Sequence, residues 1–191
     1  MERRSIVLLL ALTGLLGLPA SGAAVQGEAL WTLLQAGGHV ILIRHTVTTP
    51  GVGDPPGMQL TDCATQRNLS EEGRRDARHI GDVFRRRGIP VARVLSSPWC
   101  RCLDTARLAF GEAEAWPPLS NLFGRPENRS PQLRELERLV GQRVPAGNLV
   151  LVSHGSTIDA LTGVSSLPGE VVILTPQGGG RFTVAGRLTA S

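Results

Sequence analysis

Three short apolar runs, separated by stretches with helical periodicity, are the feature that most constrains the fold of this chain. The runs cover residues 39–43, 91–95 and 149–153, and each has the length of a strand. The first and the third are almost continuously apolar, as in strands buried on both faces, whereas Arg93 interrupts the second. Strands that alternate with helices favour a mostly parallel sheet with helices on both faces. The sequence therefore predicts an α/β fold of three layers.

The segments between these runs carry recognisable helix and turn signals. Residues 28–36 have an amphipathic pattern that glycines end, and Ser70 precedes two glutamates and a helical stripe, as an N-cap does. Ser130 and Pro131 predict another capped helix start. Residues 171–174 and 181–184 flank a glycine-rich turn, which predicts a hairpin at the edge of the sheet. Residues 46–68 are rich in proline and glycine and predict a long loop, which is usually functional in a compact domain.

The beginning of the chain has the pattern of a secretory signal peptide. Arg3 and Arg4 form a basic start, residues 6–18 are apolar, and small residues with cleavage options near Ala23 follow. We expect residues 1–23 to be a signal peptide and residues 24–191 to be a single domain. The apolar segment is short for a membrane span, so no stable membrane anchor is expected.

Charge and cysteine content narrow the class of protein further. All 20 basic residues are arginine, and the formal net charge is +4, too small and too scattered for a nucleic-acid partner. Export permits disulfides, and Cys63 is expected to pair with either Cys100 or Cys102. The cysteine and histidine spacings disfavour a zinc site, and we expect neither a metal nor a cofactor.

Charged residues lie directly after the predicted strands. Arg44 and His45 follow the first strand, the segment 96–101 with Arg101 follows the second, and His154 follows the third. In open α/β sheets, ligands bind outside the carboxyl ends of the strands, so these side chains are expected at one edge. Arginines grip phosphate oxygens, and a neutral histidine can attack phosphorus and form a covalent intermediate. The pattern predicts a phosphoryl-transfer site.

Four motifs in this region resemble the histidine phosphatase superfamily, which has the phosphoglycerate-mutase-like fold. They occur in the family's order: LIRHT at 42–46, NLSEEG at 68–73, SSPWCR at 96–101 and VSHG at 152–155. The resemblance implies that His45 is the phosphorylated nucleophile and that Arg44, Arg101 and His154 bind the phosphate. The segment 63–70 is similar to a loop of small exported bacterial members, including lipopolysaccharide-core heptose phosphate phosphatases. That similarity suggests Arg67 as a further phosphate or substrate contact.

Two positions depart from the family's pattern. Thr46 stands where a glycine usually follows the nucleophile, and Asn121 stands where the family often carries a glutamate that donates a proton. Glu127 is the first candidate for a replacement acid, and Asp54 in the long loop is the second. General acid catalysis contributes about 10²–10⁴-fold, so its absence would slow ester hydrolysis without abolishing it.

We therefore expect a periplasmic or secreted phosphatase that hydrolyses a phosphomonoester through phospho-His45. Its partner would be a small-molecule or envelope-glycolipid phosphate, and no nucleic acid. Two alternatives stay open because the acid is missing. One is a binding protein that captures phosphorylated ligands with little or no turnover. The other is a phosphatase for phosphohistidine or another phosphoramidate, whose leaving group needs less help.

Overall fold

A six-stranded sheet forms the centre of the protein, in the strand order β3-β2-β4-β1-β5-β6. The computed structural model describes residues 27–189, so the predicted signal peptide at 1–23 lies outside the described residues. The strands are β1 (Val40–Arg44), β2 (Val91–Ser96), β3 (Glu114–Ala115), β4 (Asn148–Ser153), β5 (Val171–Gly178) and β6 (Arg181–Leu188). The three strands predicted from the apolar runs are confirmed, with ends shifted by at most one residue.

Parallel pairing joins the four strands β3, β2, β4 and β1, whereas β5 and β6 are antiparallel. The antiparallel pairing of β5 with β6 confirms the predicted hairpin, although both strands extend well beyond the predicted segments. The register of β1 and β4 pairs Val40 with Leu149 and Arg44 with Ser153. Because β1 and β4 end at the same level, the residues that follow them emerge side by side.

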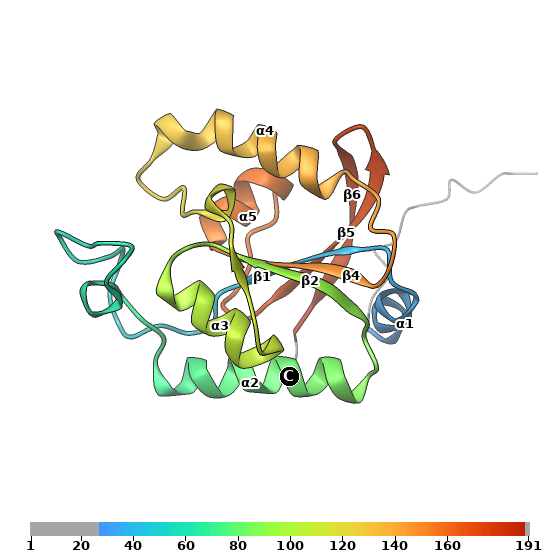
Figure 1. Ribbon diagram of the computed structural model, residues 1–191, viewed down its shortest axis with the longest axis horizontal. Helices are drawn as coiled ribbons and strands as arrows, with labels where there is room; N and C mark the ends of the chain where they lie inside the picture. The colour runs from blue at the N-terminus through green and yellow to red at the C-terminus, as the bar shows by residue number, and fades with distance from the viewer. Residues whose placement is uncertain (1–26, 190–191) are drawn as a thin grey trace, which may run out of the picture.

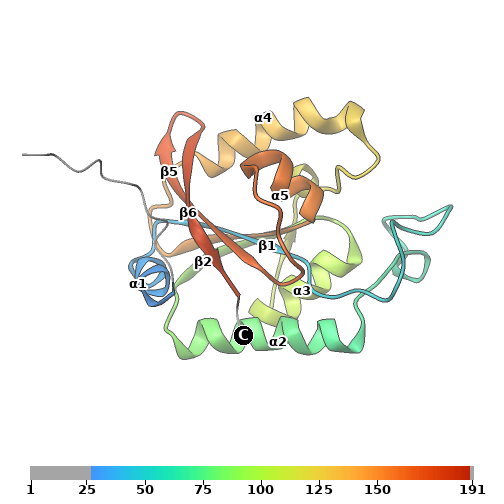
Figure 2. The ribbon, with the colours of Figure 1, turned by 180° about the vertical axis from the view of Figure 1, so that it is seen from behind.

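Helices cover both faces of the sheet, as Figures 1 and 2 show. One face carries α1 (Glu28–Ala36), α2 (Glu71–Arg86) and α3 (Cys100–Phe110), and the other carries α4 (Arg129–Val140) and α5 (Gly155–Thr162). Three 3-10 turns, η1 (Cys63–Thr65), η2 (Pro117–Leu119) and η3 (Pro126–Asn128), lie in the connecting loops. The predicted three-layer α/β fold is thus confirmed.

The side chains of β1 show why its run is continuously apolar. Ile41 and Ile43 pack in the core beneath α1, α2 and α3, and Val40 and Leu42 pack in the core beneath α4 and α5. Successive strand residues point to opposite faces, so a strand covered on both sides buries every side chain. Each such burial contributes about 1.5–3 kcal/mol. This packing holds the end of β1 rigidly in place.

The predicted helix starts have different outcomes. Ser70 caps α2, because its hydroxyl accepts a hydrogen bond of 3.1 Å from the backbone N–H of Gly73. Ser130 does not cap α4, which begins one residue earlier, at Arg129. The 3-10 turn η3 leads directly into α4, and Asn128 already has a right-handed helical backbone (φ −84°, ψ −12°). The chain therefore enters this helix without an extended residue at which Ser130 could cap it.

Candidate active site

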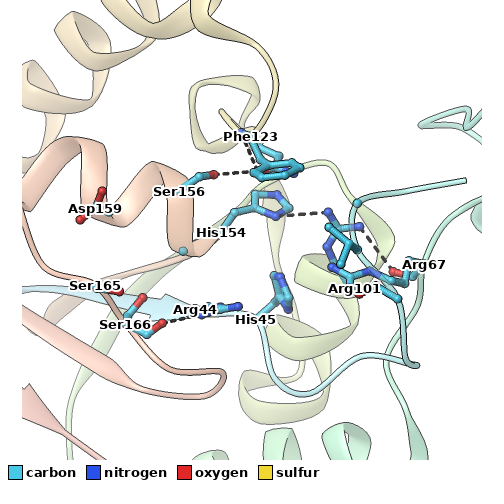
Figure 3. A pocket seen from close by; sticks show the side chains of 15 residues that line it. Arg44, His45, Arg67, Arg101, Phe123, His154, Ser156, Asp159, Ser165 and Ser166 are labelled. Atoms are coloured by element: carbon cyan, nitrogen blue, oxygen red, sulfur yellow. Dashed lines mark hydrogen bonds between the residues drawn. The ribbon is translucent and has the colours of Figure 1, made fainter.

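A cavity of about 480 Å³ opens at the carboxyl edge of the parallel strands. One end of it, here called the cationic end, is formed by Arg44, His45, Arg67, Arg101 and His154. Beyond Arg44 and His154 the lining is made of polar residues, here called the polar end: Asn121, Ser156, Asp159, Ser165 and Ser166. All four residues that the sequence motifs assigned to a phosphate site, and also Arg67, therefore line one cavity (Figure 3).

Strand register brings the two histidines together. The backbone N–H of His45 donates to the carbonyl of Ser153 over 2.9 Å, which continues the β1–β4 pairing past the end of β1. The imidazole rings of His45 and His154 then lie edge to face, with ring centroids 5.4 Å apart. Their proximity follows from the strand ends and does not depend on the loops.

Hydrogen bonding fixes the proton position on His45. Its Nδ1 lies 2.9 Å from the carbonyl oxygen of Thr46. A carbonyl can only accept, so Nδ1 carries the hydrogen and Nε2 keeps its lone pair. Burial lowers the pKa of His45 to about 3, so the ring is neutral at physiological pH. His45 therefore presents the unprotonated nitrogen that a nucleophile requires.

His154 is fixed in the other tautomer. Its Nδ1 lies 3.4 Å from Nη2 of Arg101, which can only donate, and its Nε2 lies 2.8 Å from the hydroxyl of Ser97. The proton of His154 is therefore on Nε2, donated to Ser97. Burial, together with the charges of neighbouring groups, lowers the pKa of His154 well below its usual value, so this ring is also neutral.

Arg101, on the first turn of α3, is 1% exposed and pairs with a carboxylate of the long loop. Its Nη1 and Nη2 donate to the two oxygens of Asp54 over 2.6 Å and 3.1 Å. The indole N–H of Trp99 and the backbone N–H of Arg67 donate to the same carboxylate. Burial would raise the pKa of Asp54, but these hydrogen bonds and the charge of Arg101 lower it overall. Asp54 is thus ionised and acts as an anchor for the loop, which argues against a proton donor at this position.

Arg44 and Arg67 lack such a carboxylate. Arg44 donates from Nη1 to the carbonyl of Ser166, and Arg67 donates from Nη1 to the carbonyl of Gly51. The Nε atoms of both side chains are buried and have no hydrogen-bond partner among the described residues. Desolvation and the charges of neighbouring arginines lower the pKa values of both groups. Both arginines are half-buried and neither makes a salt bridge among the described residues, so an anion in the cavity would stabilise them.

The amino end of α5 adds to this site. His154 is the N-cap of α5, and Gly155 and Ser156 in its first turn both line the cavity. A Cβ atom on Gly155 would lie 3.2 Å from the Arg44 guanidinium carbon, so glycine allows Arg44 to cross the start of the helix. Backbone N–H groups in a first helical turn have no helical partner and attract anions.

Thr46, which replaces a glycine of the family pattern, has a structural role. Its hydroxyl donates to the carbonyl of Gly73 over 2.8 Å, and its backbone N–H donates to the hydroxyl of Thr105. A Cβ atom on Gly73 would lie 1.9 Å from the carbonyl oxygen of Val47, so glycine is needed for this close approach. Thr46 thereby ties the segment after His45 to α2 and α3.

The structure does not bring Glu127 into the cavity. Glu127 lies on η3 and is exposed, and its carboxylate accepts only a long hydrogen bond of 3.5 Å from its neighbour Asn128. Asn121, the residue found where the family often has glutamate, does line the cavity. The position itself is therefore retained, but an amide occupies it and an amide cannot donate a proton as a carboxylic acid can.

One of the two expected disulfide alternatives is present. Cys63 and Cys100 are bonded, which links the long loop to the start of α3 beside Arg101. Cys102 stays a buried free thiol, and burial raises its pKa to about 12. A thiol that stays protonated is inert, so Cys102 has a packing role against His154.

Two contacts that orient residues of the site were not identified from the sequence. Ser97 orients His154, and the carbonyl of Ser166 holds Arg44. The serine pair before Pro98 is a weak signal for the first of these contacts. The contact between Arg44 and the carbonyl of Ser166 joins residues 122 positions apart, so no local sequence pattern predicts it. Among the described residues, no group of three or more His, Cys, Asp or Glu could hold a metal ion.

Solved structures share the fold of this chain. The protein histidine phosphatase SixA bound to tungstate is 17% identical with a TM-score of 0.57, and the alignment covers 80% of this chain and 97% of SixA. An open reading frame product of Mycobacterium tuberculosis is 17% identical with a TM-score of 0.61, covering 81% and 99%. A phosphoserine phosphatase mutant of Entamoeba histolytica bound to phosphoserine is 14% identical with a TM-score of 0.56, covering 80% and 98%. At these identities, the likeness shows the fold alone.

Sequence comparison gives the more specific result. Among curated proteins, no sequence matches the chain. A family model, described as the histidine phosphatase superfamily (branch 1), matches residues 40–138, just over half of the 191 residues. The matched segment holds His45, Arg44 and Arg101, and the fold places His154 beside them. The chain therefore belongs to branch 1 of the histidine phosphatase superfamily.

Proposed function

We propose that this protein is an exported phosphatase that hydrolyses a phosphomonoester through a phosphohistidine on His45. The observation that carries the proposal is the state of His45: a buried neutral ring, with Nδ1 held by Thr46 and Nε2 free of any hydrogen bond among the described residues. It lines a cavity together with three arginines. A neutral nucleophile within a group of cations suits attack on an anionic phosphate.

The reaction has two steps. In the first, the lone pair of His45 Nε2 forms a bond to phosphorus while the bond from phosphorus to the leaving oxygen breaks, and that oxygen takes the electron pair and a proton. In the second, a water oxygen bonds to phosphorus and gives up one proton to solvent while the phosphorus–nitrogen bond breaks. Nε2 takes back the electron pair of that bond, which releases phosphate and restores neutral His45. Arg44, Arg67 and Arg101 would hold the phosphoryl oxygens, and their charge is most useful when negative charge develops.

His154 and Ser97 support the phosphate site. Ser97 and Arg101 hold the two ring nitrogens of His154, so its orientation is fixed before any ligand binds. The ring packs edge to face against His45 and against Trp99, and it is 2% exposed. In this role His154 closes the site over the nucleophile and excludes water from one side.

The lack of a suitably placed acid among the described residues favours a second candidate function, hydrolysis of a phosphoramidate. Asp54 is ionised and bonded, Glu127 lies outside the cavity, and Asn121 cannot supply a proton. Asp159 lines the cavity but lies roughly 7.5 Å beyond His154 along the axis of α5, away from the reacting centre. Ester hydrolysis would then take its proton from water. A phosphoramidate, such as phosphohistidine, has a nitrogen that protonates more readily, so it would react with less help. A binding protein with little turnover is the remaining alternative.

Export is supported by two features of the chain. Residues 1–23 have the signal-peptide pattern, and Cys63–Cys100 is a disulfide of the kind that persists in oxidising compartments. Among residues 27–189, no helix is long and apolar enough to cross a membrane. We place the protein in the periplasm or outside the cell, where its substrate would be a small-molecule or envelope-glycolipid phosphate.

A substrate panel tests the proposal. The mature protein is assayed with phosphorylated sugars, nucleotides, 4-nitrophenyl phosphate and phosphoramidates, next to His45→Ala. Its matched control is His79→Ala, since His79 is exposed on α2, away from the cavity. We expect turnover to disappear in His45→Ala and to persist in His79→Ala. Turnover that survives in His45→Ala would refute the nucleophile, and tight phosphate binding without turnover of any compound would favour the binding protein.

A further inference from the structure

The cavity extends well beyond the proposed phosphate site at the cationic end. Its volume of about 480 Å³ lies within the range of roughly 300–1,000 Å³ typical of sites for whole small molecules. The polar end lies away from Arg101 and Arg67, across Arg44 and His154, as Figure 3 shows. With the phosphoryl group at the cationic end, the alcohol part of a substrate would occupy the polar end.

Helix α5 connects the two ends. His154 caps this helix, and Ser156 and Asp159, three residues apart, both line the cavity. Residues three or four apart share a face of a helix. At 1.5 Å of rise per residue, Asp159 lies roughly 7.5 Å beyond His154 along the helix axis. Asp159 is thus placed to contact the leaving group, at a distance from the reacting phosphorus.

Asp159 brings a negative charge to this end. Of the residues that line the cavity, it alone carries a carboxylate, and no salt bridge within the described part of the chain neutralises it. Asp54 differs in this respect, since Arg101 holds both of its oxygens. A free carboxylate accepts hydrogen bonds from hydroxyl groups, attracts an ammonium group and repels another carboxylate.

Neutral polar groups line the same end of the cavity. Asn121 accepts through Oδ1 from the Ser156 hydroxyl over 2.7 Å and from the backbone N–H of Phe123 over 3.1 Å, so its NH₂ group remains for a ligand. Ser166 is 3% exposed, and its hydroxyl has no partner among the described residues. An unpartnered buried hydroxyl in the wall of a cavity is a ready site for a ligand's hydroxyl group.

From these features we infer that the polar end selects phosphomonoesters whose alcohol part is rich in hydroxyl or amino groups and carries no negative charge. Asp159 is the residue that sets this charge preference. The inference rests on the proposed function, because it assumes that the phosphoryl group lies beside His45. It adds a substrate class to that function: phosphates of polyols and amino alcohols are accepted, and phosphates of hydroxy acids are disfavoured.

Three phosphates of one six-carbon skeleton test the charge preference: glucosamine 6-phosphate, glucose 6-phosphate and 6-phosphogluconate. They place a positive, a neutral and a negative leaving group at the polar end. We expect kcat/KM to fall in that order. A unit charge pair about 4 Å apart in water contributes about 1 kcal/mol, or about fivefold, at each step. In Asp159→Asn the three values should come within about twofold of one another, since the charge is gone.

Two controls separate a specific role of Asp159 from a general one. Glu137→Gln removes an exposed carboxylate of α4 that does not line the cavity, and it should keep the wild-type order. Hydrolysis of 4-nitrophenyl phosphate by Glu137→Gln should also match that of the wild type. Equal kcat/KM for the three substrates in the wild type, or an unchanged order in Asp159→Asn, would overturn the inference.

Binding measurements keep the inference testable if turnover fails. Calorimetry with His45→Ala, alone and combined with Asp159→Asn, measures the affinity of the same three compounds without reaction. The affinities should follow the same order in the first protein and converge in the second. That result without hydrolysis in the wild type would refute the proposed function and leave the charge preference standing, whereas equal affinities in His45→Ala would refute the preference itself.

Discussion

The two ends of the cavity are built in different ways. At the cationic end, His45 and His154 follow strands buried in the core, and both rings and Arg101 are almost wholly buried. At the polar end, Asp159 and Ser165 are exposed, and they belong to a short helix and to the loop after it. The two histidines proposed to take part in the chemistry are held by the ends of the sheet strands, whereas Asp159, proposed to choose the substrate, lies on an exposed part of a short helix.

Charge separates the two ends as clearly as burial does. The cationic end holds three guanidinium groups, of which Asp54 pairs with one, whereas the polar end holds a single carboxylate and neutral groups. Phosphate binding needs fixed positive charge, and discrimination among leaving groups needs adaptable polar contacts. Substitutions at the cationic end should therefore lower the activity on every substrate alike. Substitutions at the polar end should change the activity on some substrates more than on others.

Loss of Arg101 should have the largest effect. Arg101→Ala removes a buried donor group at the proposed transition state, and we expect kcat/KM to fall by about 10²–10³-fold for every phosphoester. Steady-state kinetics on the three sugar phosphates and on 4-nitrophenyl phosphate measures this.

The variant also leaves the half-buried carboxylate of Asp54 without its cationic partner, which can destabilise the fold. Arg101→Ala combined with Asp54→Ala removes that unpaired carboxylate and should melt closer to the wild type while staying equally slow. Recovery of activity in the double variant would show that Arg101 only neutralises Asp54, and the cationic end would lose its proposed role.

Low pH should destabilise the folded protein because it favours protonation of the buried His45 ring. Its pKa is about 3 in the folded protein and 6.5 in the unfolded chain, so the unfolded state binds the extra proton between these values. Stability is therefore full above pH 6.5 and falls as the pH drops toward 3. For His45 alone, the free energy of unfolding should fall by about 3 kcal/mol between pH 7 and pH 4.

Urea unfolding of the wild type and of His45→Asn at both pH values measures this contribution. The variant cannot take up the proton, so it should lose about 3 kcal/mol less than the wild type over the same interval. Equal losses of unfolding free energy in the two proteins would mean that the fold does not hold His45 neutral. The burial of the cationic end would then not explain the state of the nucleophile.

Glu127 should have the smallest effect. It is exposed and lies outside the cavity, so Glu127→Gln should change kcat by less than about twofold, as surface substitutions usually do. A pH–rate profile of the variant is the measurement. Loss of the limb that reports a general acid would assign the proton to Glu127 and would require a rearrangement of η3 toward the cavity.

The sequence could predict most of the cationic end because its positions follow from periodic patterns. Apolar runs locate the strands, and a residue directly after a buried strand must lie at the edge of the sheet. That reasoning places His45 and His154 together without any knowledge of the loops. The same reasoning could not find the Arg101–Asp54 pair, because it joins residues 47 apart through a loop whose course no local pattern encodes.

The candidate proton donor also shows that the sequence does not predict where loop side chains lie. The sequence indicates Glu127 because it is a carboxylate in a loop near the expected site, but proximity in sequence to Asn121 does not fix where a loop side chain points. The sequence pattern misplaces the start of α4 for a related reason. A serine before proline caps a helix only where the chain enters the helix from an extended backbone, whereas here Asn128 is already helical.

Direct detection of the phosphorylated nitrogen tests the central claim. The mature protein is mixed with an excess of 4-nitrophenyl phosphate, quenched within milliseconds under alkaline conditions that preserve phosphohistidine, digested and analysed by mass spectrometry. Wild-type protein should carry one phosphoryl group on the peptide that contains His45, and His45→Ala should carry none. Hydrolysis by the wild type with no phosphoryl group on His45, or with the group on His154 or His79, would contradict the account.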